Sequence, residues 1–334
     1  ATLTITVSQN PNSDTVVTSA TSILTTAADT STATDATVTA PKAASTANEI
    51  AVIKVTLKNA AGATTTGESY TATIAGPGLL ASQPLDADLS EAAKGRAITV
   101  KAGEVVTVYP DGASGVATIT ISSAAGLVLA TETLTFYGDA SVATATVLKP
   151  VIAAAGSQAA ILVNMKDAAG TAVTQATTFY VTSSDTTKVS GAYSTTGSLT
   201  YSSTNGTLGA GFLINLTGVA EGTASITVGT KSSATATTGV NAAAVSVRVG
   251  GATAKLDGLL VATDKSSYAP GEVMTITVTP LDAAGLVLAD DTHTVFSSAG
   301  LVSSHSLTAT VATQAALTNA GVFTTLGVGT LKVY

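Results

Sequence analysis

Alternating oxygen-bearing residues at 86–91 are the chain's best candidate for metal chemistry. Asp86, Asp88 and Glu91 lie in the run Asp-Ala-Asp-Leu-Ser-Glu, which places oxygens at alternate positions, as calcium-binding loops do. The glycine that such loops carry at position six is absent, and position twelve is Ala97 instead of glutamate. We therefore treat Asp86, Asp88 and Glu91 as weak calcium candidates. The alternative is that they are solvated loop carboxylates, and no other cofactor is indicated.

The two histidines are the only residues around which catalysis can be imagined. His293 comes shortly after two aspartates and His305 directly after two serines, so the residue types of a Ser-His-Asp set are all present. No nucleophile-elbow pattern accompanies it, no third metal ligand has a characteristic spacing, and no phosphate-binding or dinucleotide fingerprint is present. Hydrolysis of sugar or protein would need a pair of carboxylates converging in a cleft. We therefore predict that the protein is not an enzyme.

Two sequons offer sites for covalent modification. Asn205-Gly206-Thr207 lies in a predicted loop, so Asn205 is the better acceptor for an N-linked sugar. Asn215-Leu216-Thr217 lies in an apolar strand. Such triplets also arise by chance in a sequence rich in threonine, so Asn205 is a weak candidate.

The elements that must carry these residues are organised as a repeat. One landmark is an eight-residue segment that ends in an Ala-Ala-Gly turn at Asn59, Asp167 and Asp282, with copies 108 and 115 residues apart. A second landmark begins at Gly115, Gly222 and Gly329, with both intervals 107 residues. Two markers that recur at nearly the same interval along a chain indicate tandem copies of one domain. The interval is close to the length of one small β-sandwich.

The composition excludes several classes of partner. Only 10% of the 334 residues are charged, against roughly 25% in a typical soluble domain. The net charge of −7 and the absence of adjacent basic residues argue against nucleic acid and anionic membrane surfaces. No apolar run approaches the roughly 18 residues that a spanning helix needs, so no membrane span is predicted. Cysteine is absent, which suits an exposed, oxidation-tolerant protein, and a start without Met is expected of a mature secreted chain or of a trimmed one.

The hydrophobic pattern predicts strands throughout. Ala and Val interleaved with Thr and Ser alternate with a period of two, and no long amphipathic helix is indicated. Residues 53–57 run into the turn 59–62, and residues 70–74 are expected to be the hairpin partner strand. We predict an all-β fold of tandem sandwiches. The predicted divisions are an N-terminal strand with an extended low-complexity segment at 1–48, and three sandwiches at 49–149, 150–250 and 251–334.

The third unit carries the most specific motif. The stretch Asp264-Lys265-Ser266-Ser267-Tyr268-Ala269-Pro270-Gly271-Glu272 precedes an alternating strand and the turn Asp282-Ala283-Ala284-Gly285. It resembles the bacterial immunoglobulin-like repeats of secreted adhesins and surface-layer proteins. The resemblance covers the last two units well, the first moderately and residues 1–48 not at all. It implies tandem immunoglobulin-like sandwiches on the cell surface, and no single molecular activity. No cell-wall anchoring motif of the kind found in many such proteins is present in this sequence.

Comparison of the repeats suggests a mode of self-association. In the first two units the second landmark is followed by a closing strand, at 132–137 and 245–249. In the third unit the sequence ends on the landmark strand itself. An edge at Leu331 and Val333 would then lack its neighbour. The donor strand we predict is Thr2, Leu3, Thr4, Ile5, Thr6 and Val7, supplied by another copy through β-augmentation. The alternatives are pairing within the same chain, or a natural chain that continues past Tyr334.

Together these features predict an extracellular structural protein. We expect a subunit of a self-assembling surface layer or filament whose main partner is itself, with cell-wall or surface polysaccharide as a further candidate partner. The alternative is an adhesin stalk or a bacteriophage tail or capsid accessory protein built from similar repeats.

Overall fold

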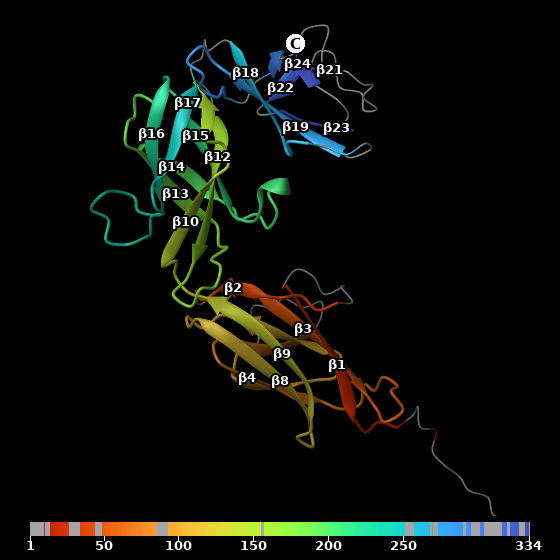
Figure 1. The fold of residues 1–334 in the computed structure, drawn as a ribbon. Coiled ribbons are helices and arrows are strands. Elements are labelled where there is room, and N and C mark those ends of the chain that lie inside the picture. The colour runs from red at the N-terminus through yellow and green to blue at the C-terminus, as the bar shows by residue number, and fades with distance from the viewer. Residues whose placement is uncertain are drawn as a thin grey trace, which may run out of the picture. The chain divides into compact units, whose positions relative to one another are not determined.

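A computed structural model shows a chain made of β-strands. It describes residues 10, 14–26, 34–43, 49–84, 93–154, 157–250, 257–267, 269, 273–289, 292–294, 301–303, 316–318, 321–326 and 331–333. Within these residues one short 3₁₀ turn, Gly206–Leu208, is the only helical element (Figure 1). The all-β prediction is confirmed. Contacts divide the chain into two compact units, Ala1–Ser141 with Met165–Gln175, and Val142–Asn164 with Ala176–Tyr334.

The first unit is a sandwich of two sheets. A four-stranded sheet has the order β1-β3-β7-β5, and a five-stranded sheet has the order β2-β9-β8-β4-β6. The strands of this unit are β1 (Ser19–Thr26), β2 (Thr39–Pro41), β3 (Ala51–Lys58), β4 (Tyr70–Ala75), β5 (Leu79–Pro84), β6 (Ala97–Val100), β7 (Glu104–Tyr109), β8 (Gly115–Ser123) and β9 (Val128–Tyr137).

Alternating side chains from both sheets fill the space between them. Ile53 of β3 and Val106 of β7 are fully buried from one side, and Ile119 and Phe136 are fully buried from the other. All four belong to one hydrophobic cluster. Because successive side chains of a strand point to opposite faces, the aliphatic positions enter the core and the threonines and serines between them face outward.

The low-complexity segment before residue 49 contributes two strands to this sandwich. β1 pairs antiparallel with β3 over eight residues, and β2 pairs in parallel with β9. Leu24 and Val38 of this segment are 2% and 3% exposed and belong to the core cluster. The segment was expected to be extended or weakly stranded, and the structure makes it part of the first unit.

The expected hairpin between residues 53–57 and 70–74 is wrong. β3 and β4 belong to different sheets, and the pairing partners of β4 are β6 and β8. The turn at 59–62 therefore starts a connection that crosses from one sheet to the other. A crossing of this kind is how an immunoglobulin-like sandwich links its two layers.

The second unit contains a sandwich on the same plan with one strand fewer. Its sheets have the orders β10-β12-β15 and β11-β17-β16-β13-β14, and β11 pairs in parallel with β17 as β2 does with β9. The strands are β10 (Val142–Val147), β11 (Val151–Ala153), β12 (Ser157–Lys166), β13 (Thr177–Ser183), β14 (Ala192–Leu199), β15 (Phe212–Thr217), β16 (Gly222–Gly229) and β17 (Val245–Gly250).

The third repeat, also in the second unit, is described in part. Antiparallel pairing joins β18 to β19 and β19 to β23, and smaller pairs join β20 to β22 and β21 to β24. Their bounds are β18 (Gly258–Thr263), β19 (Val273–Leu281), β20 (Thr292–Thr294), β21 (Leu301–Ser303), β22 (Ala316–Thr318), β23 (Gly321–Leu326) and β24 (Leu331–Val333). The sheet β18-β19-β23 repeats the order of β1-β3-β7 in the first sandwich.

Candidate functional site

The repeated turn has the same hydrogen bonds in all three copies. Each begins with an Asn or Asp whose Oδ1 accepts the backbone N–H groups two and four residues later. At Asn59 these N···O distances are both 3.0 Å, at Asp167 they are 3.0 and 2.8 Å, and at Asp282 they are 2.9 and 2.8 Å. One side-chain oxygen thus organises the whole turn, which explains why Asn and Asp share this position.

The glycine of each turn is required by its backbone conformation. Gly62, Gly170 and Gly285 have φ values of 77°, 85° and 73°. A side chain in this left-handed region meets steric strain that glycine avoids. The repeated Ala-Ala-Gly spelling is therefore explained by local geometry.

The second side-chain atom of each Asn or Asp leaves the turn and contacts the segment that precedes it in the chain. Asn59 donates from Nδ2 to the carbonyl oxygen of Asp14 at 2.9 Å. Asp167 accepts from the backbone N–H of Gly138 at 2.7 Å, and Asp282 accepts from Nη2 of Arg248 at 2.9 Å. The residue at this position is Asn where its partner accepts a hydrogen bond, and Asp where its partner donates one. We name Asn59, Asp167 and Asp282 the clamp residues.

The clamp residues are buried, and the pKa values of the two aspartates among them reflect these bonds. Their exposed fractions are 1%, 4% and 8%. Burial acts to raise the pKa of Asp167, but the N–H groups of Gly138, Thr171 and Ala169 outweigh it and lower the pKa below its ordinary value. The pKa of Asp282 is also lowered, first by the N–H of Leu286, against the effect of burial, and further by Arg248.

Arg248 links the end of the second sandwich to the third repeat within the second unit. Its guanidinium contacts the carboxylate of Asp282, the carbonyl oxygen of Val287 and, at 3.7 Å, the carboxylate of Glu221. The Arg248 side chain is 16% exposed, and that of Asp282 is 9% exposed. A forked donor is suited to holding a carboxylate and a carbonyl together.

The outer face of the five-stranded sheet in the first unit carries no charged side chain. Residues directly opposite across antiparallel strands share a face, as Thr73 does with Thr120 and Thr118 does with Thr133. Among the positions of this face on β4, β6, β8 and β9, all but the buried Tyr137 at the end of β9 are exposed or half-buried. We name it the threonine face, and it consists of Thr71, Thr73, Ala75, Ala97, Thr99, Val116, Thr118, Thr120, Ser122, Val128, Thr131, Thr133 and Thr135.

The second sandwich repeats this chemistry on the equivalent sheet. Thr182 of β13 lies opposite Thr227 of β16, and Ser225 lies opposite Ser246 of β17. Arg248, held by Asp282, is opposite Thr223 on the same face. Hydroxyl-rich outer sheets are therefore a property of the repeated module.

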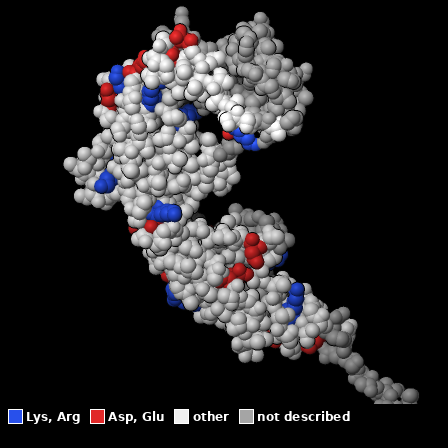
Figure 2. Space-filling model, viewed as in Figure 1, with Lys and Arg blue, Asp and Glu red and all other residues white. Residues whose placement is uncertain are grey.

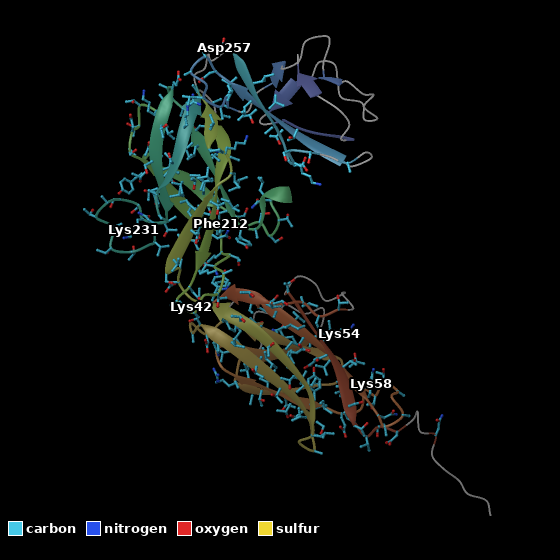
Figure 3. The ribbon with its side chains drawn as sticks, viewed as in Figure 1. Lys42, Lys54, Lys58, Phe212, Lys231 and Asp257 are labelled. Carbon is cyan, nitrogen blue, oxygen red and sulfur yellow. The ribbon has the colours of Figure 1, made fainter. Side chains whose placement is uncertain are left out.

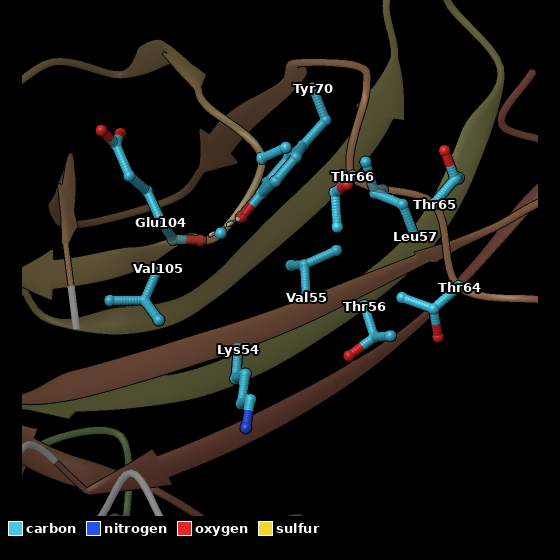
Figure 4. A pocket seen from close by; sticks show the side chains of 12 residues that line it. Lys54, Val55, Thr56, Leu57, Thr64, Thr65, Thr66, Tyr70, Glu104 and Val105 are labelled. Carbon is cyan, nitrogen blue, oxygen red and sulfur yellow. Dashed lines mark hydrogen bonds between the residues drawn. The ribbon is translucent and has the colours of Figure 1, made fainter. Parts of the chain in front are cut away.

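The first sandwich also contains a small pocket beside β3 and Tyr70. It has a volume of about 190 Å³ and is lined mainly by threonine and aliphatic groups around Tyr70 (Figure 4). The Tyr70 hydroxyl donates to the backbone carbonyl of Glu104 at 3.2 Å. Burial, aided by the charge of Glu104, raises the pKa of Tyr70 well above its ordinary value. The hydroxyl is therefore a neutral donor, and its bond is structural.

Several predicted site residues lie outside the described residues. These are the calcium candidates Asp86, Asp88 and Glu91 and the donor strand Thr2–Val7. In the part of the chain that the structure describes, no group of three or more His, Asp or Glu side chains is placed to hold a metal ion. Likewise, none of the described helical residues forms a helix long and apolar enough to cross a membrane.

Two other predicted positions are placed. Leu331 and Val333 lie on β24, the strand of the third copy of the second landmark, and within the described residues its one neighbour is β21. The strands of the first two copies, β8 and β16, each lie between two other strands. Asn205 precedes the 3₁₀ turn, and its Nδ2 donates to the carbonyl oxygens of Gly209 and Gly211, both at 3.0 Å. A sugar on Nδ2 would replace one of these two hydrogens.

Sequence reasoning missed the clamp role and the threonine face. The clamp role has a sequence signal, because Asn or Asp stands before Ala-Ala-Gly in each copy, but the partner segment can be found only from the fold. The threonine face has a signal too, because threonine recurs at every second position from Thr71 to Thr73, Thr118 to Thr120 and Thr131 to Thr135.

Solved structures similar to this chain include several bacterial surface proteins. The S-layer protein rSbsC matches 96% of this chain with 40% of its own, at 18% identity and a TM-score of 0.38. The Escherichia coli adhesin FdeC matches 93% of this chain with 88% of its own, at 16% identity and a TM-score of 0.29. Invasin, a bacterial integrin-binding protein, matches 93% of this chain with 55% of its own, at 14% identity and a TM-score of 0.25.

The chain thus spans 40% of the length of the S-layer protein that it matches. No family model matches the sequence, and no curated protein matches it. The three solved structures named above are immunoglobulin-like proteins of the bacterial surface, the group that the repeats of this chain resemble.

Proposed function

We propose that the protein is a structural subunit of an extracellular, cell-surface layer or filament that assembles from copies of this chain. The observation that carries the proposal is the threonine face. Flat, uncharged sheet surfaces can pack against each other, as the two layers of a sandwich do at about 10 Å. On this face no long charged side chain holds a neighbouring copy away.

The chemistry of the face suits contact between identical surfaces. A threonine offers a methyl group for apolar contact and a hydroxyl that both donates and accepts a hydrogen bond. Two copies of such a face are therefore compatible without matched charges. Figure 2 shows that charged side chains are sparse over the visible surface of the chain, as the 10% charged composition requires.

The size of the face limits what it can do alone. Four strands about 4.8 Å apart and about six residues long present on the order of 400 Å². A stable interface buries about 800 Å² on each partner. One threonine face is therefore too small alone, and an assembly that uses it needs further contact area.

Electron microscopy of the purified full-length chain, with and without millimolar calcium, tests the proposal. Regular sheets or filaments are expected, and a dependence on calcium would identify the ion as a switch. Persistent monomers under both conditions would contradict the proposal and favour an adhesin stalk or a phage accessory protein.

A lysine in the middle of the threonine face tests the interface itself. Thr120→Lys should abolish or strongly reduce assembly, because the ammonium group would be desolvated against an uncharged surface. Ala125→Lys, which adds the same charge at an exposed turn, is the matched control and should assemble normally. Circular dichroism checks that both variants fold. Equal assembly of the two variants would exclude the threonine face as the contact.

A further inference from the structure

The second sandwich has a sheet edge that the first sandwich fills with its own strand. In the first, β5 pairs with β7 along six residues, from Leu79 opposite Tyr109 to Pro84 opposite Glu104. β15 is the counterpart of β7 in the sheet β10-β12-β15, and within the described residues it pairs with β12 alone. The chain between β4 and β6, residues 76–96, includes β5, whereas β13 and β14 are joined by the short loop 184–191.

Specific backbone groups face this edge. Gly211 exchanges two hydrogen bonds with Ser202, and the carbonyl oxygen of Thr217 accepts from the N–H of Ser190. These contacts lie on the side of β15 away from β12. Because backbone groups alternate sides with a period of two, the N–H and C=O groups of Leu213 and Asn215 point to the same side. Among the described residues no partner for these four groups lies there.

The two flanking contacts define the length of the open edge. The bridge between Ser202 and Gly211 closes one end, and the bridge between Val189 and Gly218 closes the other. The intervening residues, 212–217, span about 20 Å as a strand. A segment of five or six residues would fill this length.

A groove lies beside the open edge. It has a volume of about 310 Å³ and is lined by uncharged side chains, among them Ser194, Thr196 and Leu199 of β14 and Leu213 and Asn215 of β15. An uncharged strand with alternating small polar and aliphatic side chains would match it. Charged segments would lose hydration there without gaining a partner.

Aromatic packing keeps the strand beside the groove in place. Phe212, labelled in Figure 3, is fully buried, with its ring centroid 5.0 Å from that of Phe179 and 5.4 Å from that of Tyr201. The edge is therefore held by a packed core, although its outer backbone groups are open. A rigid, preformed edge lowers the entropic cost of adding a strand.

We propose that β15, in place of the edge at Leu331 and Val333 predicted from the sequence, is the acceptor for a strand from a second copy, and that the strand is Thr2–Val7. This segment has six residues without a charge, and Leu, Ile and Val alternate with threonine. Added beside β15, its aliphatic side chains would face the core side, where Phe212, Ile214 and Leu216 are buried, and its threonines would lie beside Leu213 and Asn215. Strand addition at an open edge is a common mode of recognition.

The inference rests on the proposed function and gives it a direction. β1, which follows the donor segment in the chain, belongs to the first unit, and β15 belongs to the second. A strand passed between copies therefore joins the first unit of one to the second unit of another. Such a head-to-tail contact builds a filament or one row of a layer when its rotation does not close into a ring.

Disulfide trapping tests the proposal, and the chain has no cysteine to interfere. Full-length chains carrying one cysteine each, at Thr2, Thr4 or Thr6, are mixed with a chain carrying Asn215→Cys and oxidised gently. At least one pair should shift to a band at twice the 32.5 kDa monomer mass on non-reducing gels. Ser232→Cys, exposed on the loop between β16 and β17 of the same unit, is the acceptor control and should show no such shift. Ile5→Asp in the donor chain should abolish the shift.

Three results would overturn the inference. One is the absence of a dimer band with every donor position. Another is an equal dimer band with Ser232→Cys. The third is an internal disulfide in a chain that carries both cysteines, which would show that the strand inserts within its own chain. If trapping fails while microscopy still shows ordered assemblies, the strand exchange is wrong and the proposed function survives. If trapped pairs form but no ordered assembly is seen, the proposed function fails instead.

Discussion

Replacing Asp167 by asparagine isolates the hydrogen-bond logic of the clamp residues. The substitution keeps the size and shape of the side chain but turns one acceptor oxygen into an NH₂ group. In the native protein Oδ1 accepts from Ala169 and Thr171, and Oδ2 accepts from Gly138 at 2.7 Å. Whichever way the amide is oriented, its NH₂ group faces at least one N–H donor. One hydrogen bond is lost and two donors are left opposed.

The expected cost follows from burial. Asp167 is 4% exposed, so water cannot readily replace the lost acceptor. A buried donor left without a partner costs about 1–3 kcal/mol. For domains of about 100–150 residues, each kcal/mol lowers the melting temperature by roughly 2–8 °C. Differential scanning calorimetry is the suitable assay, because it can separate the transitions of the two units and needs no tryptophan, which this chain lacks.

Asp139→Asn is the matched control. Asp139 lies one residue after Gly138, and its carboxylate pairs with Lys42 at 2.7 Å, but its side chain is 88% exposed. The same chemical change there should alter the free energy of unfolding by less than about 1 kcal/mol. The reciprocal variant, Asn59→Asp, should destabilise the first unit, because a carboxylate would face the carbonyl oxygen of Asp14. If Asp167→Asn is as mild as Asp139→Asn, the clamp argument is refuted.

Two further predictions concern the same residues. Because the folded-state pKa of Asp167 is lowered, its ionised form contributes stability that is fully present above the ordinary pKa of 3.8 and is lost as pH falls through the folded-state value. Melting temperatures measured from neutral pH to below pH 3.8 should therefore decline less steeply in Asp167→Asn than in the native chain; parallel curves would contradict this. Arg248→Met should lower the hydrogen-exchange protection of the turn at 282–286, since the guanidinium no longer holds Asp282 and Val287, and should leave peptides of β8 and β9 unchanged. Unchanged protection at the turn would show that Arg248 is not needed to hold it.

The repeated turn shows how far local sequence carries the prediction. Its position, its glycine and the strand before it were all predicted from the residues, and the structure places a strand and a turn there in each copy. These features depend on groups within about five residues of one another, such as Asp282 Oδ1 and the N–H groups of Ala284 and Leu286. Interactions of such short range are encoded in the adjacent sequence itself.

The N-terminal strands show where the sequence signal was too weak. β1 contains Ile23 and Leu24 among serines, threonines and alanines, and the segment around it is low in complexity. Its eight-residue pairing with β3 and the burial of Leu24 establish it as a strand of the sandwich. The pattern alone could not distinguish a strand that will be buried from an extended surface segment, because burial is supplied by the partner layer.

The hairpin prediction failed for a related reason. A turn with glycine at positive φ is compatible with a hairpin and with a crossing between sheets, and only the destination of the next strand separates them. β4 joins β6 and β8 because its buried positions, Tyr70, Ala72 and Ile74, face the core from the second layer. Partner choice thus depends on which arrangement buries both strands.

For this protein the sequence by itself determined the strands, the repeated turns, the all-β class and the low content of charged residues. Period-two alternation, the need for glycine at positive φ, and composition can all be read from neighbouring residues. The tertiary structure alone decided which strands pair, why the clamp position is Asn59 in one copy and Asp167 in another, and that β15 has an open edge. Each of these depends on whether a hydrogen-bond partner from a distant part of the chain is present. Such partners are brought together by burial of the core, and no neighbouring residue specifies them.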